Sequence, residues 1–244
     1  FNLFSQEKIL DTLQRTKQNL DEVIVESIRV KYSAPFSHSN ISKTELSLKN
    51  LGQDLPILLN FLPSVVTTSD AGAGIGYTGI RIRGVSAQST NITINGIPFN
   101  DTESLGTYWV NLPDFTSSIE SLQVQRGVGT STNGSGAFGA SINILTDAVS
   151  EDAYAEISNS VGSYDTYKNT VKFSSGKLNN AFELSGRLSK IDSDGYIDRA
   201  FSDLKSYFLQ GSYLKGSTFI KALAFGGHEK TYQSWNGVSK DQIL

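Results

Sequence analysis

The sequence contains no cysteine and no methionine among its 244 residues. Without cysteine, neither a disulfide framework nor a thiolate metal site is possible. Because methionine is missing even at position 1, we expect that the chain is not a complete translation product. Residues 1–20 lack a basic segment followed by an apolar one, so we expect that any signal peptide has already been removed.

The chain also lacks a long apolar run and an excess of charge of one sign. No apolar run approaches the length of about 18 residues that a membrane-spanning helix needs, whereas the strands of a membrane barrel alternate and need no such run. The 21 basic and 24 acidic residues nearly balance, and no basic cluster stands out, which disfavours a nucleic-acid partner. An apolar content of 38 % is low for a single thick core.

Proline and tyrosine divide the chain into two parts. All five prolines lie at or before Pro113, whereas seven of the ten tyrosines follow residue 150. Proline removes a hydrogen bond from a sheet, so this shift predicts a turn-rich first part and uninterrupted strands after it. We place the boundary near Val149 and expect a lead-in segment at 1–20, a domain at 21–149 and strands at 150–244.

The first part carries signals for short helices and short strands. Ser42 and Glu45 have capping-box spacing, and Asp54 precedes Pro56 as an N-cap with proline in the first turn. Four segments alternate between glycine, asparagine or proline boundaries, and we expect them to form one small mixed sheet: 80–83, 91–95, 121–126 and 141–145. The first part is therefore predicted to be an α+β domain.

A glycine-rich stretch joins the last two of these strands. Five glycines lie between Arg126 and Ser141, at positions 127, 129, 134, 136 and 139. Glycine permits positive φ and close backbone approach, so we expect a tight, packed turn.

After the boundary, five segments have the length of roughly 9 to 11 residues that a tilted strand needs to cross a membrane. They are 152–161, 167–174, 180–191, 206–215 and 218–229. Glu183 and Arg187 alternate with Leu184 and Leu188, which predicts one face toward lipid and one toward a water-filled lumen. The same pattern places Lys168, Thr170 and Lys172 on the lumen face, opposite Tyr167, Val171 and Phe173. The last segment fits less well, because Lys221 lies in line with apolar neighbours.

The connections between these segments predict their orientation. Those at 175–179 and 216–217 are short, whereas 192–205 and the segment after Lys230 are long and polar, as expected of periplasmic turns and extracellular loops. Five strands cannot close a barrel, and an open edge in lipid leaves backbone groups unpaired. Plugged outer-membrane transporters have about 22 strands, so we expect only the first part of such a barrel here.

Several motifs occur in the order found in one family. They are Leu62-Pro-Ser-Val-Val66, Arg83-Gly84, Asn95-Gly-Ile-Pro98, Ile119-Glu120 and Arg126-Gly127. The chain therefore resembles a TonB-dependent outer-membrane receptor over residues 21–230, with a plug domain followed by barrel strands. Residues 194–199 and 231–238 resemble loops of the ferric-citrate and siderophore receptor branch.

The resemblance assigns a TonB box to an acidic start followed by a β-branched run: Asp21, Glu22, Val23, Ile24 and Val25. It implies that this segment pairs as an added strand with the periplasmic TonB protein. An ordinary first strand of the plug sheet is the alternative.

The resemblance also assigns charge pairs that hold the plug against the barrel wall. It places them at Arg83, Glu120 and Arg126, and solvated surface charge is the alternative for all three. A ligand arriving from outside would meet the loops 68–78 and 99–109. Asn100, Thr107, Tyr108 and Trp109 offer it hydrogen bonds and aromatic faces, although Tyr108 and Trp109 could instead pack the plug.

The sequence gives little support for nucleotide binding, catalysis or metal binding. Gly74, Gly76 and Gly79 have dinucleotide-binding spacing, but an alternating strand follows them instead of a helix. The two histidines, His38 and His228, lie in different predicted parts. We therefore expect no enzyme activity, no catalytic or metal site and no cofactor.

The sequence thus predicts a TonB-dependent importer in the outer membrane of a Gram-negative bacterium, with a periplasmic N-terminus. The expected cargo is a ferric siderophore or ferric citrate, with cobalamin and oligosaccharide as alternatives within transport. An alternative from another class is a plugged barrel that scaffolds lipoproteins or other outer-membrane proteins.

Overall fold

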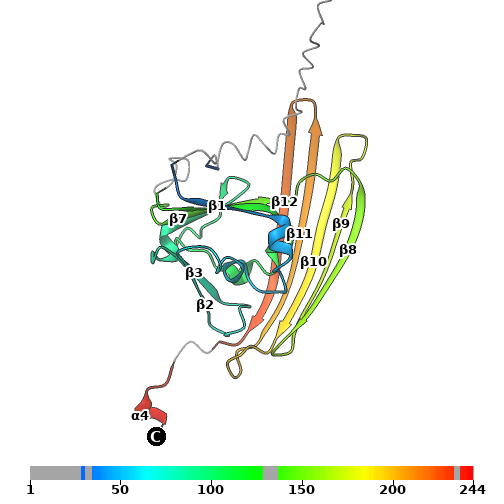
Figure 1. Ribbon diagram of the computed structural model, residues 1–244. Helices are drawn as coiled ribbons and strands as arrows, with labels where there is room; N and C mark the ends of the chain where they lie inside the picture. The colour runs from blue at the N-terminus through cyan, green and yellow to red at the C-terminus, as the bar shows by residue number, and fades with distance from the viewer. Residues whose placement is uncertain (1–28, 31–34, 129–136, 234–236, 244) are drawn as a thin grey trace, which may run out of the picture.

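Two bodies of different architecture follow one another along the chain (Figure 1). The structure is a computed structural model that describes residues 29–30, 35–128, 137–233 and 237–243. Short helices and two small sheets make up the N-terminal domain, and five long antiparallel strands make up the C-terminal sheet. The predicted fold class is confirmed. The last strand of the domain, β7 (Ala140–Thr146), and the first of the sheet, β8 (Ala153–Gly162), lie on either side of Val149.

The main sheet of the N-terminal domain is mixed, with strand order β1-β6-β7-β4-β5. Only β4 and β7 run parallel. Besides β7, its members are β1 (His38–Ser42), β4 (Thr90–Ile94), β5 (Ile97–Pro98) and β6 (Ile119–Arg126).

The predicted strand at 80–83 is not in this sheet, which corrects the sequence-based expectation. As β3 (Thr78–Ile82) it pairs only with β2 (Val65–Ser69), in a separate two-stranded sheet. Arg83 and Gly84 follow with φ of 55° and 74°, so the chain turns sharply at the end of β3.

The two predicted helices are present and short. Ser42 and Glu45 form the capping box before α2 (Lys43–Ser47), with Ser42 N donating to Glu45 Oε2 at 2.8 Å. Asp54 precedes α3 (Leu55–Leu58), but its side chain does not cap the helix and accepts from Thr78 Oγ1 at 2.8 Å instead. Three 3₁₀ turns complete the domain: η1 (Ala87–Ser89), η2 (Trp109–Asn111) and η3 (Phe115–Ser118). No helix in the part of the chain described here is long and apolar enough to cross a membrane.

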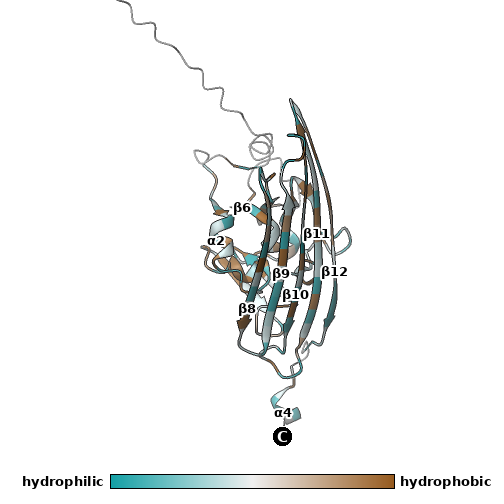
Figure 2. Ribbon diagram, turned by 90° about the vertical axis from the view of Figure 1, so that its right-hand side faces the viewer, coloured by the Kyte–Doolittle hydropathy of each residue, from teal (hydrophilic) through white to brown (hydrophobic). Residues whose placement is uncertain are grey.

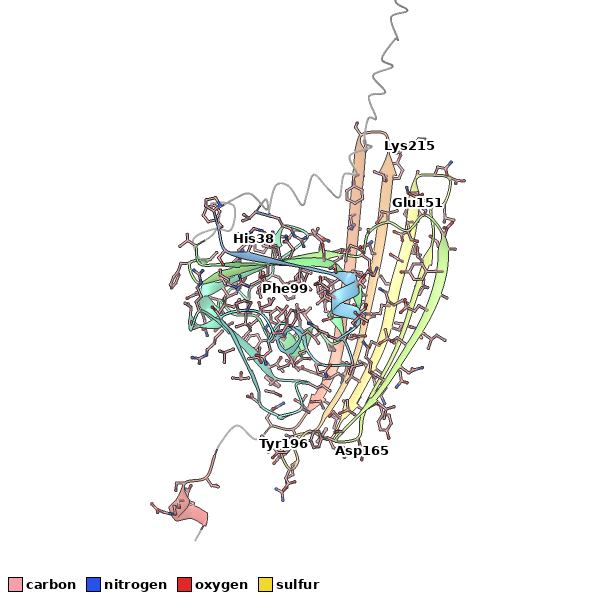
Figure 3. All side chains as sticks on the ribbon, in the orientation of Figure 1. His38, Phe99, Glu151, Asp165, Tyr196 and Lys215 are labelled. Atoms are coloured by element: carbon pink, nitrogen blue, oxygen red, sulfur yellow. The ribbon has the colours of Figure 1, made fainter. Side chains whose placement is uncertain are left out.

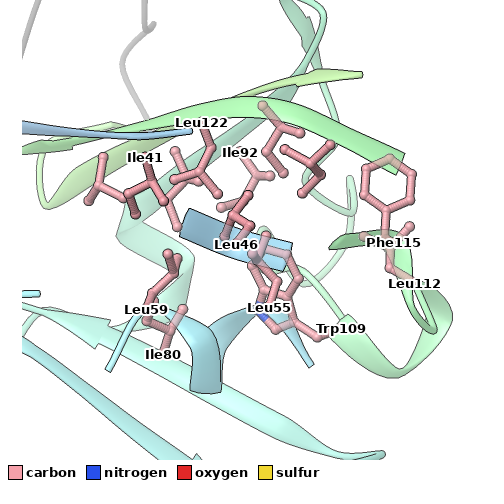
Figure 4. Packing of buried hydrophobic residues seen from close by; sticks show 14 of the residues in the cluster. Ile41, Leu46, Leu55, Leu59, Ile80, Ile92, Trp109, Leu112, Phe115 and Leu122 are labelled. Carbon is pink, nitrogen blue, oxygen red and sulfur yellow. The ribbon is translucent and has the colours of Figure 1, made fainter. Parts of the chain in front are cut away.

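The core of the N-terminal domain lies between the mixed sheet and the short helices (Figure 4). Leu122 and Ile92 point down from the sheet, and Leu46, Leu55 and Leu59 point up from the helical segments. Alternation along the strands supplies one face, and the helices bury their few leucines against it.

The predicted glycine-rich turn is only partly observable, because residues 129–136 lie outside the described residues. At its ends the expectation of close backbone approach holds. Gly127 N donates to Gly139 O at 2.8 Å, and a Cβ on Gly139 would lie 2.8 Å from Ser89 O. Only glycine fits at position 139 without displacing that backbone.

The C-terminal sheet contains the five predicted strands in the order β12-β11-β10-β9-β8. After β8 come β9 (Thr166–Ser175), β10 (Phe182–Ser193), β11 (Ser202–Lys215) and β12 (Thr218–Thr231). The sheet curves around the N-terminal domain, which lies against its concave face (Figure 1). A short helix, α4 (Lys240–Ile243), follows.

The two faces of the C-terminal sheet differ as the alternation predicts. Leu184, Leu188 and Leu209 are exposed on the convex face, whereas Glu183, Arg187 and Gln210 are buried on the concave face. Figure 2 shows brown apolar bands along these strands. Lys221 lies in line with Leu223 and Phe225 because β12 packs these apolar residues onto the domain core, which explains the irregular pattern of the fifth segment.

The long connection predicted at 192–205 is shorter in the structure, whereas the short connections, at 176–181 and 216–217, lie close to their predicted bounds. Strands β10 and β11 extend into the expected 192–205 loop, with Asp192 opposite Asp203, so the connection covers only 194–201. It lies at the same end as the tight 163–165 turn, where Tyr196 and Asp165 are labelled, while Lys215 and Glu151 mark the other end (Figure 3). The length of the connections therefore distinguishes the predicted periplasmic end of the sheet from the extracellular end less clearly than the sequence suggests.

Candidate functional site: the contact between domain and sheet

Asp114 is placed at the contact by an unusual backbone. It has φ of 51° and ψ of 24°, the left-handed region, between buried Leu112 and Phe115. Aspartate tolerates this region better than most residues. With its two apolar neighbours held in the domain core, the carboxylate of Asp114 faces β9 and β10 of the C-terminal sheet.

Five side chains donate hydrogen bonds to this carboxylate. Oδ1 accepts from Ser117 Oγ at 2.6 Å, Lys168 Nζ at 2.8 Å and Asn50 Nδ2 at 3.2 Å. Oδ2 accepts from the hydroxyls of Thr170 and Ser189, each at 2.7 Å. Both oxygens are thus satisfied in a buried position, and three of the five donors belong to the C-terminal sheet. We call Asn50, Asp114, Ser117, Lys168, Thr170, Arg187 and Ser189 the Asp114 cluster.

Arg187 of β10 completes the cluster. Its Nη1 lies 3.5 Å from Asp114 Oδ2 and donates to the carbonyl oxygens of Pro113 and Asp114. Its Nη2 donates to Ser206 Oγ at 3.2 Å. The side chain is only 2 % exposed, so the predicted water-filled lumen is wrong here: the face is inward as expected, but the N-terminal domain fills it.

The charge state of Asp114 follows from these neighbours. Burial alone raises the pKa of this carboxyl, but the charges of Arg187 and Lys168, together with the hydrogen bonds, outweigh it and hold the pKa at about 2. Asp114 is therefore ionised at any physiological pH.

A second charged contact lies at Asp147, in the segment between the two bodies. Its Oδ2 is 3.0 Å from Lys172 of β9, and its Oδ1 is 2.7 Å from Lys43 of α2. Its carbonyl accepts from Gln210 at 2.9 Å and Lys221 at 3.1 Å. Asp114 and Asp147 together connect the domain with four strands of the sheet.

An apolar contact lies beside the charged ones. The ring of Phe115 packs edge-on against Phe208 at 5.8 Å and Phe225 at 5.3 Å. Pro113 packs against Gly227, where a Cβ would lie 3.5 Å from Pro113 Cδ. The domain core thus continues onto β11 and β12.

The outer loops of the two bodies are joined by backbone hydrogen bonds. Ala71 O, in the 70–77 loop of the domain, accepts from Tyr196 N at 2.8 Å and Ile197 N at 3.2 Å. Both donors belong to the 194–201 connection. A movement of either loop would therefore stretch or break these hydrogen bonds and so affect the other loop.

Of the residues predicted to pair with the barrel wall, Glu120 and Arg126 have partners within the N-terminal domain instead. Glu120 pairs with Lys43 at 3.2 Å, and Arg126 donates to Pro63 O, Ser37 Oγ and Ser39 Oγ, all within the N-terminal domain. Arg83 is exposed. The observed pairs between domain and sheet are those of Asp114 and Asp147, and a barrel contact of the three predicted residues stays a prediction.

The four predicted ligand-binding residues differ in accessibility. The side chain of Asn100 is occupied by β4 and by its own loop, accepting from Ile92 N and donating to Thr90 O and Leu105 O. Trp109 is 4 % exposed and packs in the domain core, which agrees with the alternative prediction that this residue packs within the domain. Tyr108 is 51 % exposed, and the buried hydroxyl of Thr107 has no partner among the described residues. Ligand binding by these residues stays a prediction, with Tyr108 the most accessible of them.

The predicted TonB box, Asp21 to Val25, lies outside the described residues, as does the lead-in segment 1–20.

Sequence reasoning missed Asp114, Asp147 and the Ala71–Tyr196 contact. It did place Lys168, Thr170, Lys172 and Arg187 on the inner face, because alternation along a strand reports direction. Asp114 and Asp147 lie in loops, where no periodicity exists and where an aspartate normally indicates a solvated turn.

Comparison with known proteins places this geometry in context. Residues 30–141 match the model of the TonB-dependent Receptor Plug Domain family. The chain is 31 % identical over 204 residues to the vitamin B12 transporter BtuB of Vibrio vulnificus, covering 82 % of this chain and 32 % of that protein. It is 26 % identical over 223 residues to the probable TonB-dependent siderophore receptor PirA of Acinetobacter baumannii, covering 86 % and 27 %.

The solved structures agree on the fold. The unliganded ferric citrate transporter FecA superposes with a TM-score of 0.66 at 17 % identity, over 87 % of this chain and 34 % of that one. The chain spans about a third of the length of the relatives it matches.

Proposed function

The chain belongs to the TonB-dependent receptor family, and we propose that it supplies the plug and the first five wall strands of an outer-membrane transporter for a scarce nutrient carried as a metal chelate. The observation that carries the proposal is the seating of the plug against the concave face of the sheet through buried ion pairs at Asp114. If apolar contacts alone fixed the plug, buried charged groups on the inner wall would have no partners, which is energetically costly.

The ion pairs suit a plug that must be held and later released. A buried pair gains little net stability, because its attraction is largely offset by the desolvation of both charges. Once the plug is displaced, water can solvate Lys168 and Arg187 again, which lowers the cost of leaving the seated position. Such an interface holds the plug against the sheet until a force acts on it, and only moderate work is needed to separate the two.

The source of that work would be the TonB protein. We place its binding segment at Asp21 to Val25, which would join a TonB sheet as an added strand. A pull on this segment acts on the N-terminal end of the plug, and the Asp114 cluster is the contact that resists it.

The cargo is proposed to be a ferric siderophore or ferric citrate. The similar proteins include a probable siderophore receptor, a ferric citrate transporter and a vitamin B12 transporter, all named for metal-containing ligands or their carriers. Tyr108 is the plug residue proposed to contact it, beside Tyr77, whose phenol pKa is raised by burial and by the nearby Glu229 and Tyr108. The apolar convex face, with Leu184 and Leu188, would contact outer-membrane lipid.

Uptake by cells tests the proposal. The full natural chain that contains these residues is expressed in cells lacking their own receptor for a radiolabelled ferric chelate, and uptake is compared with a variant lacking residues 21–25. We expect uptake to fall to the receptor-free level, whereas a variant lacking residues 11–15 retains it. Undiminished uptake without residues 21–25 would rule out TonB-driven import, and a stable stoichiometric partner without any uptake would favour the scaffold alternative.

A further inference from the structure

The inner wall carries two like charges directly opposite each other. Lys172 of β9 pairs in register with Arg187 of β10, and both side chains are buried on the concave face. Lys168 lies on the same face of β9, four residues earlier. Like charges directly opposite in an antiparallel pair destabilise it. The wall therefore needs anionic groups at this position.

The plug supplies these anions in the seated state. Asp114 Oδ1 is 2.8 Å from Lys168 Nζ, and its Oδ2 is 3.5 Å from Arg187 Nη1. Asp147 Oδ2 is 3.0 Å from Lys172 Nζ. Two plug carboxylates thus compensate three wall cations, each at contact distance.

The carboxylates of the wall itself do not replace those of the plug. Glu183 accepts from Ser174 Oγ at 2.7 Å and from Ser150 N at 3.2 Å. Glu156 lies opposite Lys172 in register, and among the described residues it forms no ion pair with Lys168 or Arg187. If the plug moves away, Lys168 and Arg187 lose their counter-charge.

A polar groove reaches two of the three cations, Lys168 and Lys172. It has a volume of about 300 Å³ and lies between α2 and η3 of the plug and strands β8 and β9. Its lining includes Lys43, Glu156, Ser158, Lys168, Thr170 and Lys172.

We infer that Lys168, Lys172 and Arg187 form an anion site on the transport path, occupied by Asp114 and Asp147 while the plug is seated and by carboxylates of the cargo when the plug withdraws. The inference rests on the proposed transport function and deepens it, since it assigns an anionic, carboxylate-bearing chelate as the cargo. Exchange of one set of carboxylates for another keeps the wall cations paired throughout passage. A cargo without anionic groups would leave them uncompensated.

Ion selectivity in planar lipid bilayers tests the site without TonB. The full natural chain carrying Asp114→Asn and Asp147→Asn loses the plug anions, and a potassium chloride gradient then reports which ion crosses. We expect an anion-selective current that millimolar citrate blocks. Adding Lys168→Gln and Lys172→Gln is expected to shift the reversal potential toward that of potassium and to abolish the citrate block.

The matched control removes the same charge from the other face. Lys190 of β10 and Lys205 of β11 are exposed and lie opposite each other on the convex side. Lys190→Gln with Lys205→Gln is expected to leave both the reversal potential and the citrate block unchanged. An equal shift in this control, or no shift on loss of Lys168 and Lys172, overturns the inference.

The test remains decisive if the asparagine variant does not fold or carries no current. If the asparagine variant does not fold, the same measurement is made on the unmodified chain with its plug loosened by urea, with the same glutamine substitutions. No current under either condition overturns the inference, because displacing the plug carboxylates would then open no path along this wall. Since no step uses TonB, the result is independent of whether uptake requires residues 21–25.

Discussion

The amide of Tyr196 donates to the carbonyl of Ala71 at 2.8 Å, which ties the outer connection of β10 and β11 to the 70–77 loop of the plug. The next residue, Gly72, has φ of 74°, and a Cβ there would lie 2.9 Å from Cβ of Tyr196. The contact thus depends on the absence of a side chain at position 72. A ligand that moves either loop would act on the other through this contact.

Gly72→Ala is therefore expected to separate the two loops. Left-handed strain for a non-glycine residue costs about 1–2 kcal/mol, and the collision with Tyr196 adds to it. Hydrogen exchange at the Tyr196 and Ile197 amides should accelerate. Gly216→Ala is the control, because Gly216 also has positive φ, 62°, but has nothing within 4 Å of the added Cβ. Equal acceleration of the Tyr196 amide in both variants would contradict a direct contact.

Asp114→Asn is expected to weaken the seating of the plug. The substitution keeps the shape of the side chain but leaves Lys168 and Arg187 buried without their counter-charge, a change that costs about 3–5 kcal/mol. Urea should release the plug at a lower concentration, as followed by the fluorescence of buried Trp109. Asp152→Asn, at an exposed carboxylate, is the control, and an unchanged midpoint for Asp114→Asn would show that the cluster does not hold the plug.

The lowered pKa of Asp114 also predicts that the seating of the plug weakens at acid pH. The pKa of Asp114 is lowered to about 2, so its stabilising effect is fully present above its ordinary pKa of 3.8 and is lost as the pH falls toward 2. Plug release in urea should become easier across this interval in the unmodified chain. The Asp114→Asn variant should lose this part of the pH dependence, and identical pH profiles for the two proteins would contradict the assignment.

The contribution of Asp54 to stability should depend on pH in the opposite sense. Burial raises the pKa of this carboxyl well above 3.8, more than the hydrogen bonds from Thr78 and Gly76 lower it. Its contribution to stability is then complete below its ordinary pKa and is lost as the pH rises through the raised value.

Asp54→Asn is accordingly expected to slow hydrogen exchange in the 70–77 loop at neutral pH and to have little effect near pH 3.8. An amide still accepts from Thr78 Oγ1 but is never charged. Asp70→Asn, at an exposed position of the same loop, serves as the control. Faster exchange in Asp54→Asn at neutral pH would show that the ionised form of Asp54 stabilises the loop.

The convex face offers a test of side-chain packing toward lipid. A Cβ on Gly186 of β10 would lie 2.6 Å from Cζ of Phe173 and 2.9 Å from Cδ2 of Leu209, so Phe173 lies across the glycine. Gly186→Ala is expected to displace that ring, at a cost of about 1–3 kcal/mol. Gly211→Ala on β11, where nothing lies within 4 Å, should change the unfolding temperature in lipid vesicles little. The opposite ranking would contradict this packing.

Local chemistry explains which elements were predictable from sequence. The five strands of the C-terminal sheet lie within a few residues of their predicted bounds, because alternation over ten residues is a property of the strand itself. The capping box of Ser42 and Glu45 also formed as predicted, since its two partners are three residues apart. Asp54 departed from its predicted role because Thr78, distant in sequence, offered its side chain a hydrogen bond in a buried position.

Taken by itself, the sequence determined the α+β domain, the long antiparallel strands after it and the direction in which Lys168, Lys172 and Arg187 point. Only the tertiary structure decided what those cations face. Asp114 and Asp147 lie in loops and reach β9 across 54 and 25 residues of chain, to Lys168 and Lys172 respectively. Alternation shows which side of a strand a residue occupies but carries no information on the body packed there, and that body turned a predicted aqueous lumen into a buried, charge-paired contact.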